Sequence, residues 1–160
     1  MSPQREWQLL EDIVEGAIRQ LGPELKKRPL EIKIDDDLPP VHVDAVEIQR
    51  VFVNLMDNAM KYSPARSPIR LTAARVGADV EVRVSDTGPG VSSEERMRIF
   101  ERFYRAPTSG KGRVRGTGLG LAICKGIIEA HGGRIHCQSI PNVETTMIFT
   151  IPRHRNPPQA

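Results

Sequence analysis

Apolar and polar residues alternate in several stretches of the chain, and one of them ends in an acidic, glycine-rich turn. Val80, Val82 and Val84 face one side of a predicted half-buried strand. A period of two places Asp86 on the same inward face, where an unpaired carboxylate is costly. The turn at 86–90, Asp-Thr-Gly-Pro-Gly, therefore either caps its own backbone or brings this carboxylate to a partner with hydrogen-bond donors.

Helical spacing of apolar residues appears in three long stretches and one short one. A Gly-Pro pair ends the first, a Ser-Pro pair the second and a Gly-Gly pair the last. At the start of the second, Asp44 with Glu47 three residues later fits a capping box. The predicted helices span 7–21, 44–62, 92–105 and 121–130.

Alternation also predicts strands, which we place at 30–34, 41–43, 69–73, 80–86, 134–139 and 145–151. The strand at 41–43 is expected to pair with that at 30–34. The strands at 69–73 and 80–86 are expected to form an antiparallel hairpin. Residues 107–116, rich in glycine, serine and cations, predict a mobile loop, and 154–160 a disordered tail.

The composition is that of one soluble globular domain. The 160 residues are 39% apolar and 27% charged, without an apolar run of membrane-spanning length or an N-terminal apolar signal region. We expect a cytoplasmic, monomeric piece and leave open whether its parent protein lies in the bacterial inner membrane. Cys124 and Cys137 form neither a disulfide framework nor a metal cluster and are expected to be buried thiols.

Polar side chains recur along one side of the otherwise apolar helix at 44–62. They follow one another at steps of three and four residues: Glu47, Arg50, Asn54, Asn58 and Lys61. A polar stripe on a buried helix needs partners. The asparagines are either satisfied structural residues or, with the lysine, part of a site for an anion or a hard cation that takes oxygen ligands.

Cations and glycines gather just before the last predicted helix. Residues 102–115 hold five cations and no acid, so this segment is either a solvated loop or a contact for an anionic partner. Interleaved aromatic residues are missing from the loop, so nucleic acid is not the expected partner. The glycines at 116–120 would expose the N–H groups of a helix start, which suits phosphate, although their spacing matches neither a Rossmann fingerprint nor a Walker A motif.

Four motifs in this order resemble the nucleotide-binding boxes of the sensor histidine kinases, within the GHKL superfamily of gyrase-type, chaperone and mismatch-repair ATPases. The N box is NLMDNAMKY at 54–62, the first G box DTGPG at 86–90, the F box FERFY at 100–104 and the second G box GTGLGL at 116–121. The F box narrows the resemblance to histidine kinases. The second G box and its helix are similar to the potassium-responsive Kdp sensor kinases.

The resemblance implies a two-layer α/β sandwich, in which about three helices cover one face of a mixed sheet of about five strands. ATP would bind between helices, under a flexible lid. We assign residues 1–153 to this ATP-binding catalytic domain and 154–160 to the tail.

Carried over residue by residue, the resemblance implies ATP and Mg²⁺ as ligands. Asp86 would accept a hydrogen bond from the adenine amino group. Asn58, with help from Asn54, would hold Mg²⁺, Lys61 would face a phosphate, and Tyr62 would lie along the nucleotide. The other implied nucleotide contacts are Gly88, Gly90, Arg105, Lys111, Gly116, Thr117, Gly118, Leu119, Gly120, Leu121 and Thr145. Thr146 is the alternative to Thr145, and the preceding Glu144 stands where the family often has glycine.

The family's phosphoacceptor histidine, which an acidic residue follows, has no counterpart here. None of His42, His131, His136 and His154 precedes an acid, and each is expected to be structural or exposed to solvent. The resemblance therefore implies a domain that binds Mg-ATP and donates the γ-phosphoryl group to a histidine on a separate dimerisation domain, with a response regulator downstream. The alternative is a regulatory module that binds ATP without transferring phosphate.

Overall fold

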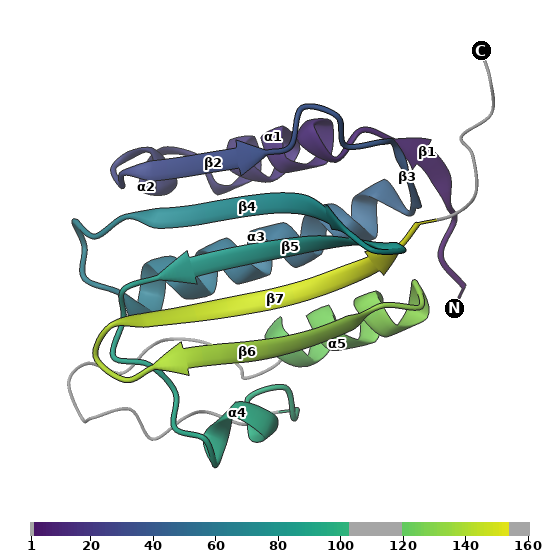
Figure 1. The fold of residues 1–160 in the computed structure, drawn as a ribbon. Helices are drawn as coiled ribbons and strands as arrows, with labels where there is room; N and C mark the ends of the chain where they lie inside the picture. The colour runs from purple at the N-terminus through teal and green to yellow at the C-terminus, as the bar shows by residue number, and fades with distance from the viewer. Residues whose placement is uncertain (1, 103–119, 154–160) are drawn as a thin grey trace.

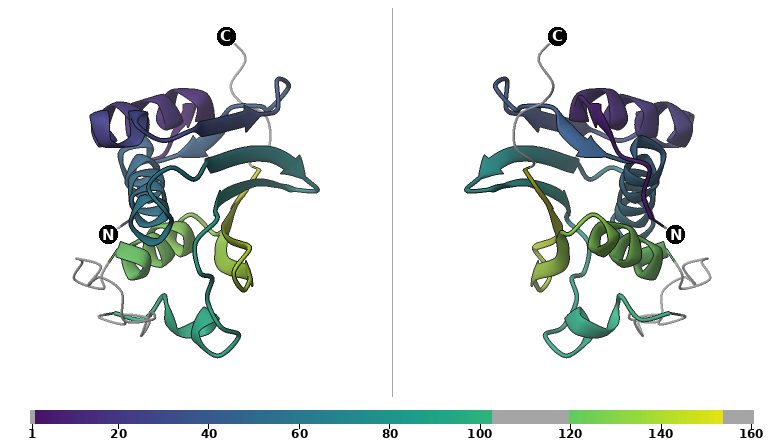
Figure 2. Two further views of the ribbon diagram at one scale, coloured as in Figure 1. Left: turned by 90° about the vertical axis from the view of Figure 1, so that its left-hand side faces the viewer. Right: turned by 90° about the vertical axis from the view of Figure 1, so that its right-hand side faces the viewer.

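The computed structural model describes residues 2–102 and 120–153 as two layers, a mixed sheet and the helices that cover one of its faces (Figures 1 and 2). The strand order is β2-β4-β5-β7-β6. The sheet comprises β2 (Leu30–Ile34), β4 (Ile69–Val76), β5 (Asp79–Asp86), β6 (Arg134–Ile140) and β7 (Glu144–Pro152). The covering helices are α1 (Leu10–Leu21), α3 (Ala45–Tyr62) and α5 (Gly120–Ala130). The predicted α/β sandwich is thereby confirmed.

Four short elements complete the described chain: β1 (Glu6–Gln8), α2 (Pro23–Lys26), β3 (Val41–Val43) and α4 (Glu95–Arg98). The hairpin of β4 and β5 is confirmed, but the predicted pairing of 41–43 with 30–34 is wrong. β3 pairs with β1, whereas β2 pairs in parallel with β4. A parallel pair needs a long crossover, and the chain between β2 and β4 supplies it through α3.

The apolar spacing predicted Trp7 in the first helix, but Trp7 lies in the strand β1. α1 begins at Leu10, and the ring centroid of Trp7 lies 4.9 Å from that of His42 in β3. Trp7 stands three residues before Leu10, which fits one face of a helix. The alternation of polar and apolar residues in 6–8 equally fits a strand. The presence of β3 as a partner strand decides between the two conformations.

The core forms where α3 lies against the sheet. Phe52 of α3 and Phe149 of β7 are fully buried, and their rings meet edge to face with centroids 5.5 Å apart. This contact joins the two layers. The free thiols of Cys124 and Cys137 are buried, as predicted. Within the described ranges, no helix is both long and apolar enough to cross a bilayer.

The start of α3 is fastened to the end of α5. The side chain of Asp44 accepts a hydrogen bond from the N–H of Glu47 at 3.2 Å, as the capping box predicted. The N–H of Asp44 donates to Nε2 of His131 at 3.1 Å. In a capping box this N–H would instead donate to the side chain of Glu47. Because Nδ1 of His131 lies 2.8 Å from the carbonyl of Ile127, Nδ1 carries the proton. His131 is therefore structural, as expected.

Candidate functional site

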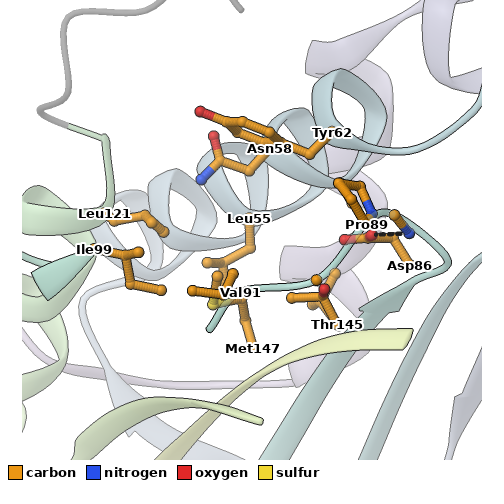
Figure 3. A pocket seen from close by; sticks show the side chains of 14 residues that line it. Leu55, Asn58, Tyr62, Asp86, Pro89, Val91, Ile99, Leu121, Thr145 and Met147 are labelled. Carbon is orange, nitrogen blue, oxygen red and sulfur yellow. Dashed lines mark hydrogen bonds between the residues drawn. The ribbon is translucent and has the colours of Figure 1, made fainter. Parts of the chain in front are cut away.

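A pocket opens between α3, the end of β5 and the start of α5 (Figure 3). Its walls are mainly apolar, with a few polar groups, a pattern typical of small-molecule sites. The residues that line it are Leu55, Asn58, Ala59, Tyr62, Val84, Asp86, Gly88, Pro89, Gly90, Val91, Ile99, Leu121, Thr145 and Met147. Three of the predicted boxes thus contribute to one cavity, although they lie far apart in the sequence.

Asp86 is the acidic group of this pocket and is 9% exposed. Its Oδ1 accepts a hydrogen bond from the N–H of Gly88 at 2.8 Å, so the carboxylate does cap its own turn. No described residue donates to Oδ2, which leaves one oxygen for a ligand. Burial raises the pKa of Asp86 to about 6, although the Gly88 N–H and the positive charge of Arg28 act in the opposite direction.

The glycines after Asp86 are required by close contacts. A side chain at Gly88 would collide first with the carbonyl oxygen of Tyr62, and one at Gly90 with Oγ of Ser139. Gly90 also has a φ of +88°, which favours glycine. The turn therefore packs closely between the end of α3 and β6, and this packing fixes the position of Asp86.

The polar stripe of α3 divides between several partners. Asn58 lines the pocket, and no described residue bonds to its side chain. Asn54 donates from Nδ2 to the carbonyl of Gly120 at 3.4 Å and so ties α3 to the first residue of α5. Lys61 does not line the pocket, because its ammonium group pairs with Asp57 at 2.8 Å and borders a separate hollow. Its predicted contact with a phosphate stays a prediction.

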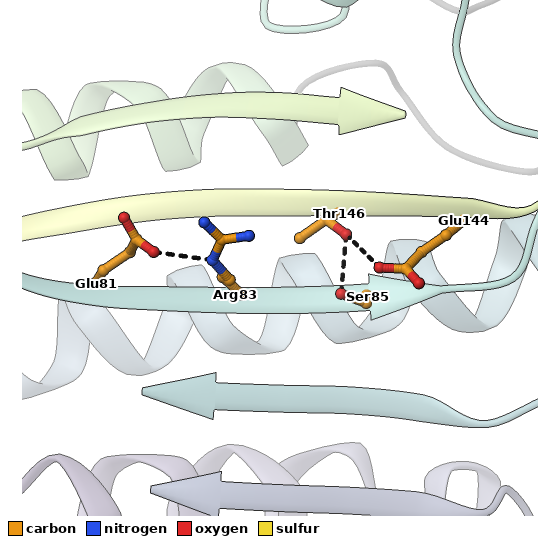
Figure 4. A network of polar contacts seen from close by, with 5 residues as sticks. All are labelled: Glu81, Arg83, Ser85, Glu144 and Thr146. Carbon is orange, nitrogen blue, oxygen red and sulfur yellow. Dashed lines mark hydrogen bonds and ion pairs between the residues drawn. The ribbon is translucent and has the colours of Figure 1, made fainter. Parts of the chain in front are cut away.

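β7 presents its two neighbouring threonines, Thr145 and Thr146, to opposite faces of the sheet. Thr145 pairs in register with Asp86 and lines the pocket. Thr146 lies on the other face, where it donates to Oε1 of Glu144 at 3.0 Å and lies 2.9 Å from Oγ of Ser85 (Figure 4). Of the two candidates, the structure places only Thr145 in the pocket. Glu144 is accommodated on the opposite face.

Several lining residues were not among the predicted contacts. Leu55, Val91, Ile99 and Met147 belong to the apolar wall of the pocket (Figure 3). The alternation of β7, with Thr145, Met147 and Phe149 on one face, was the signal that could have identified Met147. Val91 comes from the irregular stretch after β5, and Ile99 follows α4 directly, so the predicted helix at 92–105 gave no sign that either residue would reach the pocket.

Six predicted contacts lie outside the described residues: Arg105, Lys111, Gly116, Thr117, Gly118 and Leu119. Of the second G box the structure describes Gly120 and Leu121, and Leu121 reaches the pocket. The contacts that the basic segment would make with phosphate therefore stay predictions.

Thiol chemistry and a clustered metal centre are both disfavoured in the part of the chain that the structure describes. Burial raises the pKa of Cys124 to about 12 and that of Cys137 to about 11, which keeps both thiols protonated near neutral pH. Among residues 2–102 and 120–153, no three His, Cys, Asp or Glu side chains come together as metal ligands.

Residues 43–155 match the family model of histidine kinase-, DNA gyrase B- and HSP90-like ATPases, and the chain belongs to this family. Within it, the chain is similar to sensor kinases. It is 35% identical to sensor protein KdpD of Escherichia coli (strain K12) over 96% of this chain and 17% of KdpD. It is 39% identical to the adaptive-response sensory kinase SasA of Synechococcus sp. (strain JA-3-3Ab) over 91% of this chain and 39% of SasA. The chain thus spans less than half the length of these curated relatives.

Solved structures agree with this assignment. The catalytic domain of histidine kinase ThkA superposes with a TM-score of 0.81 at 26% identity, over 94% of this chain and 98% of that domain. Full-length ShkA in complex with AMPPNP superposes with a TM-score of 0.83 at 25% identity, over 96% of this chain and 32% of ShkA. The chain is an ATP-binding domain of the kind found in two-component sensor kinases.

Proposed function

We propose that the domain binds Mg-ATP in the Asp86 pocket and donates the γ-phosphoryl group to a histidine on a separate dimerisation domain. The observation that carries the proposal is Oδ2 of Asp86, to which no described residue donates, at the end of an apolar pocket. An adenine ring would fill the apolar space, and its amino group would donate to that oxygen. A guanine ring would present a carbonyl to the carboxylate, so the pocket favours adenine.

The phosphates would extend from the base towards Asn58 and the start of α5. Asn58 offers a neutral amide oxygen, which suits a Mg²⁺ whose charge the phosphates already balance. Bound there, the ion would supply neutralisation of phosphate charge. The start of α5, whose Leu121 lines the same pocket, would favour an anion there through the N–H groups of its first turn. These residues bind and orient the nucleotide.

In the transfer itself, an imidazole nitrogen of the acceptor histidine would form a bond to the γ-phosphorus while the bond to the bridging oxygen breaks. ADP leaves, and the imidazole loses its proton to solvent. None of the four histidines of this chain is followed by an acid, and His131 is committed to Asp44 and Ile127. The acceptor therefore belongs to another domain. ThkA has been solved in complex with the response regulator TrrA, and we propose a response regulator as the downstream partner.

Two measurements test the proposal in sequence. Calorimetry with Mg-ADP and Mg-ATP should show binding, and no heat at millimolar nucleotide would overturn it. The domain is then mixed with the dimerisation domain of its parent kinase and labelled ATP. Acid-labile label on that domain supports phosphotransfer. Binding without label would identify the domain as an ATP-binding regulatory module.

The metal assignment has its own test. Asn58→Ala should reduce the part of the nucleotide affinity that depends on Mg²⁺, because it removes the proposed amide ligand. Titrations with ADP in Mg²⁺ and in a chelator measure this difference. Asp86→Asn is the control, since it should weaken binding equally under both conditions. An unchanged metal dependence in Asn58→Ala would refute the assignment.

A further inference from the structure

Arg28 is a buried arginine that belongs to none of the four boxes. It lies between α2 and β2 and is 9% exposed, which is rare for an arginine without a dedicated role. Its guanidinium group donates from Nε to the carbonyl of Ser67 at 3.1 Å and from Nη1 to the carbonyl of Met60 at 3.2 Å. Nη2 donates to the hydroxyl groups of Ser63 and Ser67. The planar group thus holds the segment from Met60 to Ser67 through two backbone carbonyls and two serine hydroxyl groups.

These acceptors belong to the last turn of α3 and the turn that follows it. The carbonyl of Met60 is one of the terminal carbonyls that an α-helix leaves without an internal partner, and a cation is favourable there. The same turn of α3 carries Asn58 and Tyr62, which line the pocket. Arg28 therefore fixes the direction in which α3 ends.

The end of α3 is in turn the support of the Asp86 turn. The carbonyl oxygen of Tyr62 is the nearest atom to the position where Gly88 would carry a side chain. The N–H of Gly88 holds Oδ1 of Asp86. Arg28 therefore bonds to the end of α3, the end of α3 lies against Gly88, and Gly88 bonds to the carboxylate of Asp86. The positive charge of Arg28 also lowers the pKa of Asp86, whereas the negative charge of Glu144, like burial, raises it.

We propose that Arg28 is a positioning residue of the nucleotide site, which sets the place and the charge of Asp86 without touching the ligand. The inference rests on the proposed function, because it assigns a role at the same pocket. It predicts that nucleotide affinity depends on the fork of hydrogen bonds that Arg28 makes, and that the pH dependence of binding depends on its charge.

Two variants separate these contributions. Arg28→Lys keeps the charge but loses the planar fork, and Arg28→Met loses both. The control is Arg70→Lys, because Arg70 is an exposed arginine of β4 that pairs with Glu31 at 2.9 Å. For each variant, calorimetry measures the affinity for Mg-ADP from pH 5 to 8, and thermal unfolding measured by circular dichroism confirms the fold.

Arg28→Lys should bind Mg-ADP about tenfold more weakly, as expected for losing a well-placed charged hydrogen bond, and still unfold cooperatively. In Arg28→Met the pKa of Asp86 should rise, because its carboxyl group loses a nearby cation and keeps the negative charge of Glu144. Binding should therefore begin to weaken at a higher pH as the pH is lowered. This upward shift should vanish in an Asp86→Asn background, where titration of the nucleotide itself is the remaining pH dependence. Arg70→Lys should match the wild type.

Three results would overturn the inference while the wild type binds nucleotide. They are a folded Arg28→Lys with wild-type affinity, an Arg28→Met whose affinity falls equally at every pH, and unfolding of Arg28→Lys, which would make Arg28 a structural residue. Failure of the wild type to bind Mg-ADP would instead overturn the proposed function, so the two failures are distinguishable.

Discussion

At the scale of single residues, Asp86 divides its two oxygens between the protein and the pocket. One oxygen closes the turn on Gly88, and no described residue bonds to the other. A buried carboxylate oxygen to which no described residue donates is costly, and burial accordingly raises the pKa of Asp86. The stability of the apo domain and the affinity for nucleotide should therefore respond in opposite ways when the charge is removed.

Asp86→Asn should weaken binding of Mg-ADP by about 10- to 100-fold, the usual range for a lost hydrogen bond to a charged group. The amide keeps an oxygen for Gly88 but can turn an N–H₂ group towards the adenine donor. Calorimetry measures the loss, and Asp79→Asn, at the opposite end of β5, is the matched control. Wild-type affinity in the Asp86 variant would contradict the adenine assignment.

The unfolding free energy should also depend on pH through Asp86. Its folded pKa of about 6 lies above its ordinary value of 3.8, so its favourable contribution is present below pH 3.8 and is lost as the pH rises through 6. Asp86→Asn avoids this loss and should gain stability over the wild type by up to about 3 kcal/mol, at about 1.4 kcal/mol per pKa unit. Urea unfolding at pH 4 and pH 7 measures the difference. An equal difference at both values would exclude Asp86 as its source.

At the scale of elements, α3 connects the two ends of the molecule. Its first turn is held by Asp44 and, through the N–H of Asp44, by His131 at the end of α5. Its last turn is bonded to Arg28, and the carbonyl oxygen of Tyr62 at its end lies close to Gly88 of the Asp86 turn. The cap and the pocket are thus at opposite ends of one helix.

Asp44→Ala should destabilise the domain by about 1–2 kcal/mol, as expected for an N-cap that loses its side-chain acceptor. Nucleotide affinity should stay at the wild-type value, because the pocket lies at the other end of α3. Thermal unfolding and calorimetry measure the two quantities, and Asp44→Ser, which can still cap, should recover most of the stability. A large loss of affinity in the folded alanine variant would show that the two ends are coupled.

Most elements follow from the sequence, because periodicity of two or 3.6 residues determines which positions can be buried. The extent of α3 and the hairpin of β4 and β5 agree with the prediction to within a few residues. The partner of β3 could not be predicted, since a three-residue strand carries no register of its own. The side chain of Lys61 was equally undetermined, because Asp57 one turn earlier competes for its charge.

At the scale of the whole molecule, a single interface holds the helices on the sheet. Phe52 and Phe149 belong to it, and the other buried residues of this cluster come from α1, α3, α5 and each central strand, among other elements. The pocket lies at one end of this interface, so Leu55 and Ala59 serve both the core and the ligand site.

Phe149→Ala should therefore destabilise the entire domain, by about 3–5 kcal/mol, the range found when a buried aromatic ring is replaced by alanine. Unfolding should remain a single transition, because one core cluster joins α1, α3, α5 and the central strands. Saturating Mg-ADP should raise the unfolding temperature of this variant, since its pocket residues are intact. Differential scanning calorimetry follows both effects. Two separate transitions would show that the layers do not share one core.

The sequence by itself determined the inward carboxylate of Asp86 and the glycines that surround it, because these depend on local periodicity and backbone sterics. The class of fold came from the four boxes and their resemblance to the sensor histidine kinases. The tertiary structure alone decided which groups meet. It paired Asp86 with Thr145, turned Thr146 and Glu144 to the opposite face, and buried Arg28 behind the end of α3. Such contacts join residues far apart in the chain, and only the packing of helices on the sheet sets their distances.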